Sequence, residues 1–171
     1  MTPPVLVTGP TEPVVAVADL RAHLRVVGTH DDAVIAGLHD AAVAHLDGWR
    51  GVLGRAIRSQ VWRVTATGEG PHLLPMPDVT AIAATVGGGP VAVESELTVR
   101  GAQVTVPGVT GDAVVTFTCE MPAQLRPAAE MAVKLMVGHW YEHREAVGPS
   151  SIVALPLAVD ALIGALRWRS A

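Results

Sequence analysis

The sequence predicts an α+β fold in which a small antiparallel β unit is inserted into a helical unit. Three observations predict it: apolar residues recur at helical spacing near both ends, polar and apolar residues alternate in the middle, and glycines and prolines cluster between these segments. We expect about four helices, with the β unit between the second and third long helical segments. The expected boundaries are residues 1–13 for an N-terminal arm, 14–54 and 122–171 for the helical unit, and 55–121 for the β unit.

Composition limits the classes of protein that are possible. At 171 residues, of which 50% are hydrophobic and 4% aromatic, the chain can bury one aliphatic core without disulfide bonds or metals. Sixteen acidic against twelve basic side chains give a formal charge of −4, which lacks the basic excess of proteins that bind DNA tightly. The apolar stretches are shorter than the ~20 residues that span a bilayer, so we expect a soluble protein without a membrane contact.

Residues near the N-terminus predict an extended arm followed by two helices. Four prolines between Met1 and Pro13 favour the arm, and no basic, uninterrupted apolar stretch there indicates a secretory signal. The first helix is expected over Val17–Arg25 and is ended by Gly28. The second begins with Asp31 and Asp32 as capping acids and ends at Gly51 and Gly54, with an apolar face formed by Ile35, Leu38, Ala42, Leu46 and Trp49.

The middle of the chain changes to the period of β-strands. Alternation predicts about four or five strands, which include Ile57–Ala66, Ile82–Val86, Val104–Val106 and Val114–Cys119. Gly87, Gly88 and Gly89 predict a hairpin turn, because no Lys-Ser/Thr pair and helix follow them as in a phosphate-binding loop. Cys119, the one cysteine, is expected to be an inert thiol within a strand.

Helical spacing returns after Pro122. Pro127 fits the first turn of a helix that is expected to reach about Glu145, with one face formed by Met131, Ala132, Leu135, Met136, His139 and His143. Residues 148–151 (GPSS) predict a linker. A last helix is expected over Pro156–Trp168, with Leu157, Ala161, Leu162 and Leu166 on its apolar side.

One motif suggests an enzyme. His139, Glu142 and His143 match the H-x-x-E-H pattern of inverted zinc metallopeptidases, which makes a small metal-dependent hydrolase the alternative function. A hydrolytic zinc site also needs a third protein ligand, and apart from Glu145 only Asp160 offers an acid after His143. We therefore favour histidines at the edge of a packed helix face, and we expect no metal, no cofactor and no catalytic residues. The other histidines are expected to be surface or satisfied core residues: His23, His30, His39, His45 and His72.

The C-terminal residues Arg167, Trp168 and Arg169 allow two interpretations. Arginine and tryptophan suit an interface and could bind a nucleic acid base or an acidic partner. They could equally be the basic end of a helix, which complements the helix dipole. The sequence leaves both open.

Several stretches carry a resemblance to a known family. In order along the chain they are residues 18–26 (ADLRAHLRV), 54–63 (GRAIRSQVWR), 74–77 (LPMP), 138–146 (GHWYEHREA) and 155–163 (LPLAVDALI). Together with the helix pair, the β insertion and the long helix, they resemble the head-to-tail connector, or adaptor, family of tailed phages, including its gene transfer agent members. The resemblance runs from about Val14 to Trp168; residues 118–122 (TCEMP) and the arm depart from the pattern.

The resemblance implies a structural protein of the virion, located at the head–tail junction and assembled in the host cytoplasm. It implies a homo-oligomeric, dodecameric ring that binds the portal on one side and a tail-side stopper or tail terminator protein on the other, while DNA passes through the lumen without specific binding. A stopper or tail completion ring is a further alternative. Family members are similar in binding the portal through the C-terminal helix, so the portal-binding candidates are Leu157, Leu162, Leu166, Arg167 and Trp168.

Overall fold

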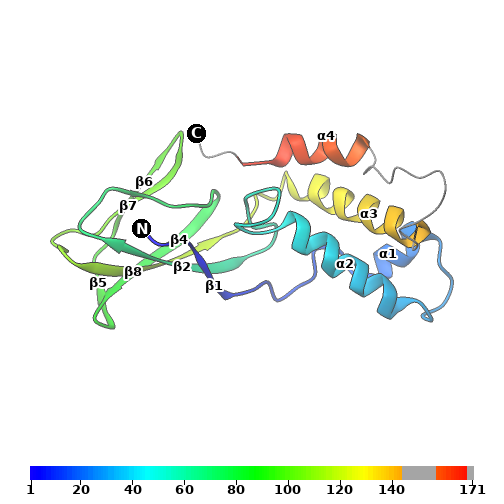
Figure 1. Cartoon of the computed structure of the whole chain (residues 1–171), viewed down its shortest axis with the longest axis horizontal. Helices are drawn as coiled ribbons and strands as arrows, with labels where there is room; N and C mark the ends of the chain where they lie inside the picture. Colours follow the sequence, from blue (N-terminus) through cyan, green and yellow to red (C-terminus); the bar gives the residue numbers. More distant parts are fainter. Residues whose placement is uncertain (144–156, 169–171) are drawn as a thin grey trace.

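The predicted α+β class is confirmed. A computed structural model describes residues 1–143 and 157–168, and within them the chain forms four helices and eight strands. The helices gather at one end of an elongated molecule and the strands at the other (Figure 1). None of the helices in the described part is long and apolar enough to cross a membrane.

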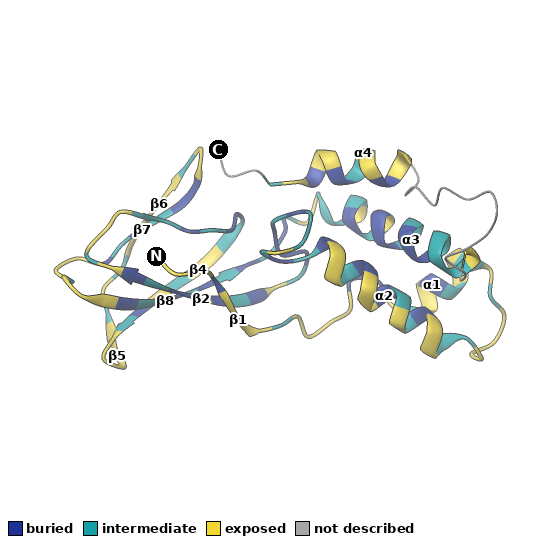
Figure 2. Cartoon of the chain, viewed as in Figure 1, coloured by how far each residue is buried: buried dark blue, intermediate teal, exposed yellow. Residues whose placement is uncertain are grey.

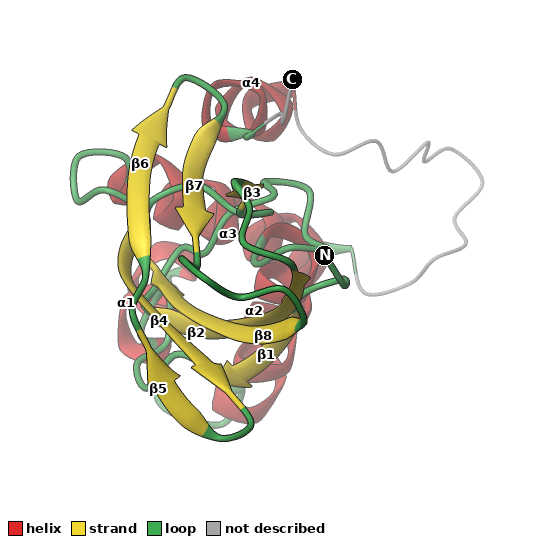
Figure 3. Cartoon of the chain, turned by 90° about the vertical axis from the view of Figure 1, so that its left-hand side faces the viewer, coloured by secondary structure: helices red, strands yellow, loops and turns green. Residues whose placement is uncertain are grey.

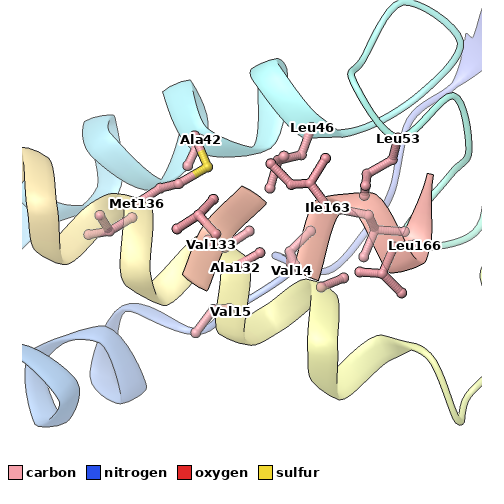
Figure 4. Close-up of a cluster of buried hydrophobic side chains, with 14 of the residues drawn as sticks. Val14, Val15, Ala42, Leu46, Leu53, Ala132, Val133, Met136, Ile163 and Leu166 are labelled. Atoms are coloured by element: carbon pink, nitrogen blue, oxygen red, sulfur yellow. The ribbon is translucent and has the colours of Figure 1, made fainter. Parts of the chain in front are cut away.

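The helical end is built around α3. Its bounds and those of its neighbours are α1 Val17–Leu24, α2 Asp32–Leu46, α3 Arg126–Glu142 and α4 Leu157–Leu166. All three other helices contact α3, which explains why its buried residues extend along most of its length. Figure 4 shows the aliphatic core that they share, in which Ala42 and Leu46 of α2, Val133 and Met136 of α3, and Ile163 and Leu166 of α4 come together.

The strands form two antiparallel sheets. The bounds are β1 Val5–Thr8, β2 Gln60–Thr67, β3 His72–Leu73, β4 Val79–Val86, β5 Gly89–Val91, β6 Glu94–Thr98, β7 Gly101–Thr105 and β8 Asp112–Cys119. A five-stranded sheet has the order β1-β2-β8-β4-β5, and a three-stranded sheet has the order β3-β7-β6. The β6–β7 hairpin stands away from the larger sheet (Figure 3).

The central strand β8 shows why this part of the chain folds as a sheet. It pairs with β2 from Gln60↔Cys119 to Thr67↔Asp112 and with β4 on its other side. Successive side chains of a strand point to opposite faces, and here Val115, Phe117 and Cys119 are buried while the residues between them are partly exposed. The alternation in the sequence is therefore the pattern of one packed face.

Some predicted turns and strands are confirmed and others were missed. Gly87 and Gly88 have positive φ values of 58° and 86°, which suit a two-residue hairpin turn, and they join β4 to β5. The N-terminal arm contains a strand, β1, that was not predicted. It pairs with β2 at Val5↔Arg63 and Leu6↔Trp62. Both faces of β1 are exposed, so no alternation marks it.

Three details of the first two helices differ from the predictions. Arg25, and not Gly28, ends α1, with a left-handed φ of 58° and the Val26 amide donating to the Arg21 carbonyl. Asp31 occupies the N-cap position of α2, but its side chain makes no capping hydrogen bond. α2 ends at Leu46, before Gly51, so Trp49 leaves the helix and packs on the core of the β unit.

His39 is buried within the α2 face and is fully satisfied. The Val15 amide donates to its Nε2 at 3.3 Å, and its Nδ1 lies 3.0 Å from the Asp40 carboxylate. Since an amide can only donate, Nε2 is the acceptor and Nδ1 carries the proton. This agrees with the expectation of a satisfied core histidine.

A buried polar junction joins the two hydrophobic cores. The Asp47 carboxylate, just after α2, accepts hydrogen bonds from the Ile57 amide at 2.7 Å and from the Gln60 side-chain amide. The Gln60 carbonyl in turn accepts from the indole Nε1 of Trp62 at 3.0 Å. Burial raises the pKa of Asp47, although these hydrogen bonds favour its charged form.

Candidate functional site

The C-terminal helix presents one buried and one exposed face. Val159, Ile163 and Leu166 are buried against the helical core, whereas Leu157 is 87% exposed. Figure 2 shows this division along α4, with the buried side turned toward α3. Within the described residues, α4 is therefore packed through one face, and its opposite face, called the free face below, is uncovered.

The predicted apolar side of this helix was wrong in part. Leu157 and Ala161 are exposed and Leu162 is half-buried, so of the four predicted residues only Leu166 belongs to the buried face. At about 100° per residue, Leu157 and Leu166 lie about 180° apart, so one face cannot hold both. The buried face instead follows the spacing of three and four residues from Val159 to Ile163 and Leu166.

Trp168 is tied to its own chain. Its backbone amide donates to the Leu53 carbonyl at 2.8 Å. A Cβ placed on Gly54 would lie 3.2 Å from the Trp168 carbonyl, and one on Gly101 in β7 would lie 3.6 Å from its indole. Trp168 thus fills the space between the end of α4 and the three-stranded sheet, and its substitution would affect folding.

Two of the five portal-binding candidates point freely to solvent. Leu157 and Arg167 are exposed, Leu162 and Trp168 are half-buried, and Leu166 is 3% exposed. Arg167 forms no ion pair within residues 1–143 and 157–168, and its backbone amide continues the helical pattern by donating to the Ile163 carbonyl at 2.9 Å. Arg169 and the linker at residues 148–151 lie outside the described residues.

The end of α3 brings His139 and His143 together. Their ring centroids are 4.7 Å apart and the rings are tilted by 33°. The Nδ1 of His143 lies 2.9 Å from the His139 carbonyl and donates to it, and the same carbonyl also accepts the backbone amide of His143 at 3.1 Å. Glu142 and His143 are both exposed, and α3 ends at Glu142 and not near Glu145.

The described residues offer no ligand set for a metal. No group of three or more His, Cys, Asp or Glu side chains in residues 1–143 and 157–168 is placed to hold an ion. The Nε2 of His139 is buried and has no hydrogen-bond partner there. In this part of the chain, the hydrolase alternative therefore has two imidazoles on one helical turn but no third side chain placed to complete a metal site.

The predicted packed face of α3 also needs correction. Its buried residues are Ala129, Ala132, Val133, Met136 and Val137. Met131 is 43% exposed, and Leu135 is half-buried. The Tyr141 hydroxyl donates a hydrogen bond to Asp31 and so ties the end of α3 to the start of α2. The sequence carries no local pattern for a contact between residues so far apart.

Comparison with known proteins identifies one fold. No protein-family model and no curated protein matches the chain. Among solved structures, it is similar to a chain in the neck of an empty gene transfer agent (GTA) particle computed with C6 symmetry, with 23% identity, a TM-score of 0.71, and coverage of 97% of this chain and 95% of that one. The fold of the two chains is the same over nearly their whole lengths.

Two further solved structures agree. A chain in the virion of a native GTA particle has 24% identity and a TM-score of 0.66, and the match covers 96% of this chain and 94% of that one. A chain in the neck of a native GTA particle computed with C12 symmetry has 20% identity and a TM-score of 0.63, with coverage of 97% and 95%. The chain thus has the α+β fold of a component of these particles.

Proposed function

We propose that this chain is a structural subunit of the neck of a phage or gene transfer agent particle, where it forms a ring that joins the portal to the tail. One observation carries the proposal: the fold matches a neck chain over 97% of this chain and 95% of that one, with a TM-score of 0.71. The expected location is the head–tail junction. The role is geometric, without catalysis.

Ring formation is supported by the symmetry of the neighbours. The two neck structures were computed with C6 and C12 symmetry, and a subunit that shares their fold can be placed in a closed ring of the same kind. A cyclic ring uses two different surfaces on each subunit, one for each neighbour. We propose a dodecamer.

The free face of α4 is the proposed portal contact. Leu157 and Arg167 supply an exposed apolar side chain and an exposed cation, and the exposed part of Leu162 lies on the same helix. Leu166 and Trp168 hold the helix on its own chain and so position that face. Arginine is enriched at interfaces and among the residues that dominate their binding energy.

The remaining partners follow from the same role. The end of the ring away from the portal binds a tail-side stopper or tail terminator protein. DNA passes through the lumen, and the formal charge of −4 suits a passage without a strong cationic grip on the phosphate backbone.

The proposal is tested by the mass and symmetry of the purified chain with and without a candidate portal, by light scattering and electron microscopy. A twelve-fold ring stacked on the portal is the expected result. A ring that binds a tail-side protein but not the portal would favour the stopper alternative. A monomer without affinity for either partner would contradict the proposal.

The portal contact is tested separately with a matched pair of variants. Leu157→Ala with Arg167→Ala removes the free apolar and cationic groups of α4, and we expect portal capture to weaken by about tenfold or more. Val27→Ala with Arg25→Gly removes the same kinds of group elsewhere, since Val27 is also 87% exposed and glycine suits the left-handed φ at position 25. Equal portal capture by both variants would exclude the α4 face as the contact.

A further inference from the structure

Two exposed apolar surfaces lie on different sides of the β unit. The first, the β1 surface, consists of Val5, Leu6 and Val7 of β1 with Arg63 of the paired strand; the three apolar residues are 53%, 47% and 52% exposed. The second, the β6 surface, is the free edge of β6 with the hairpin turn: Leu97 lies on the inner face of the strand, Glu94 and Glu96 lie on its opposite face, and Val99 lies in the turn; Leu97 is 83% exposed and Val99 is 100% exposed.

Leu97 is exposed although it belongs to the packed face of its sheet. It pairs directly with Ala102 of β7, which is 7% exposed, and it shares that face with the fully buried Val104. Beside it a cleft opens between β4 and β6, which Val79, Ile82 and Val93 also line. Leu97 is thus an apolar residue on an inner face, beside a cleft lined by both polar and apolar residues, and nothing within residues 1–143 and 157–168 covers it.

Each surface also includes an edge strand, whose outer backbone groups pair with no other strand of the described residues. Within the described residues, β1 is one edge of the five-stranded sheet and β6 is one edge of the three-stranded sheet. Exposed edge strands readily pair with other chains unless charge, a bulge or a partner shields them. β1 has a register shift between Leu6 and Thr8 and β6 carries Glu94 and Glu96, so the case for a partner rests on the exposed apolar side chains and not on the free backbone alone.

The charges of the two surfaces are complementary. Arg63 is the one charged residue of the β1 surface, and it is exposed and forms no ion pair within the described chain. Glu94 and Glu96 of the β6 surface are exposed as well. Arg100 follows Val99 at the turn, so the hairpin keeps a net negative charge.

The positions of the surfaces fit a head-to-tail contact. In the order β1-β2-β8-β4-β5, the strand β1 lies three strand spacings, or about 14 Å, from β4, which borders the cleft beside β6. Figure 3 shows the β6–β7 hairpin on the side away from β1. A head-to-tail contact needs two different, complementary surfaces that cannot meet within one subunit.

We propose that the β1 surface of one copy of this chain docks on the β6 surface of the next, with its apolar side chains against Leu97 and Val99 and with Arg63 facing Glu94 and Glu96. This inference rests on the proposed ring and names its subunit contact. The net negative charge of the hairpin makes a nucleic acid the less favourable occupant, because phosphates would be repelled.

The experiment is a charge-reversal cycle with assembly as the measurement. Arg63→Glu and Glu96→Arg each place like charges opposite one another, and we expect each to raise the concentration for half-assembly by about tenfold. The double variant restores opposite charges and should assemble to within about twofold of the wild type. That recovery also demonstrates that both substitutions leave the fold intact.

A second pair of variants tests the apolar part. Leu97→Asp should prevent assembly, whereas Val27→Asp, at a residue of similar exposure outside both surfaces, should not. Assembly is measured by light scattering and electron microscopy on the full chain, alone and with the portal.

The outcomes separate this inference from the proposed function. If the wild type forms rings and the single charge reversals and Leu97→Asp form them equally well, the subunit contact is wrong and the ring proposal stands. If the wild type forms no ring alone or with the portal, both fail. Rings lost in the single variants and regained in the double variant support the contact.

Discussion

At the scale of single residues, Cys119 shows what burial does to a reactive group. The thiol is fully buried in β8, and burial, with smaller contributions from the Asp47 and Asp78 carboxylates, raises its pKa to about 12. The thiolate is the nucleophile of cysteine chemistry, so a folded chain at neutral pH contains almost none of it. This agrees with the expectation of an inert strand thiol.

We predict that iodoacetamide leaves Cys119 unmodified in the native protein and labels it rapidly once urea unfolds the chain. Labelling is followed by mass spectrometry across the urea transition. Free cysteine added to the same solutions is the control, because its labelling reports the activity of the reagent at each urea concentration. Modification at equal rates in the folded and unfolded chain would contradict the assigned burial.

Asp47 gives a pH dependence whose sign follows from its burial. Its folded-state pKa is raised above the ordinary value of 3.8, mainly because burial disfavours the carboxylate. The folded state therefore binds more protons than the unfolded state between these two pKa values. The stability that this group contributes is complete below pH 3.8 and is lost as the pH rises through the raised pKa.

The prediction compares the wild type with Asp47→Asn, which cannot titrate. The free energy of unfolding of the wild type, relative to that of the variant, should fall as the pH rises from about 4 to about 7. Urea unfolding at each pH measures both free energies. Only the slope of their difference with pH is used, because the substitution also alters the contact with Gln60. A difference that rises with pH would show that the hydrogen bonds outweigh burial.

At the scale of elements, the two faces of α4 should respond differently to the same change. Ile163 is 8% exposed within the core, and Leu157 is 87% exposed. Ile163→Ala should lower the free energy of unfolding by about 2–4 kcal/mol through lost burial and a cavity. Leu157→Ala should change it by less than about 0.5 kcal/mol.

Thermal or urea unfolding of the two variants measures this difference. The same unfolding measurement is also a control for the portal-capture experiment. A Leu157 variant that loses portal capture while its stability is unchanged has lost a contact and has kept its fold. A similar loss of stability in both variants would mean that α4 packs through the face predicted from the sequence instead of the one observed.

The elements that the sequence predicted are those with a single packed face. α2, β2 and β8 repeat their apolar residues at the period of the element, because one face of each meets a core. β1 and β6 are exposed on both faces and carry no such pattern, so they were missed. The face of α4 was misassigned because nearly all its residues are apolar, and only the contact with α3 selects among them.

The location of the candidate site stays a prediction, and the sequence did not show which of its residues are exposed. The resemblance pointed to the C-terminal helix, but exposure divides its residues in a way that composition does not show: the Arg167 side chain is exposed and Trp168 contacts Leu53. Contacts between distant residues, such as Tyr141 with Asp31, depend on the tertiary fold and leave no local pattern.

At the scale of the whole molecule, the polar junction decides whether the two cores behave as one. Gln60 is 3% exposed, and its side chain links the carboxylate of Asp47, next to α2, with the indole of Trp62 in β2. Gln60→Ala would leave both of these groups without their shared partner, at a cost of about 2–5 kcal/mol. Because Asp47 and Trp62 belong to different ends of the molecule, the substitution should lower the stability of both the helical unit and the β unit.

We predict that the chain unfolds as one cooperative unit and that Gln60→Ala weakens both ends equally. Hydrogen exchange read by mass spectrometry should give α3 and β8 the same opening free energy in the wild type and the same decrease in the variant. Thr67→Ala is the control, since it removes the exposed hydrogen bond to Asp112 at the other end of β2 and should cost less than about 1 kcal/mol. A decrease confined to β8 would instead mean that the two cores fold separately.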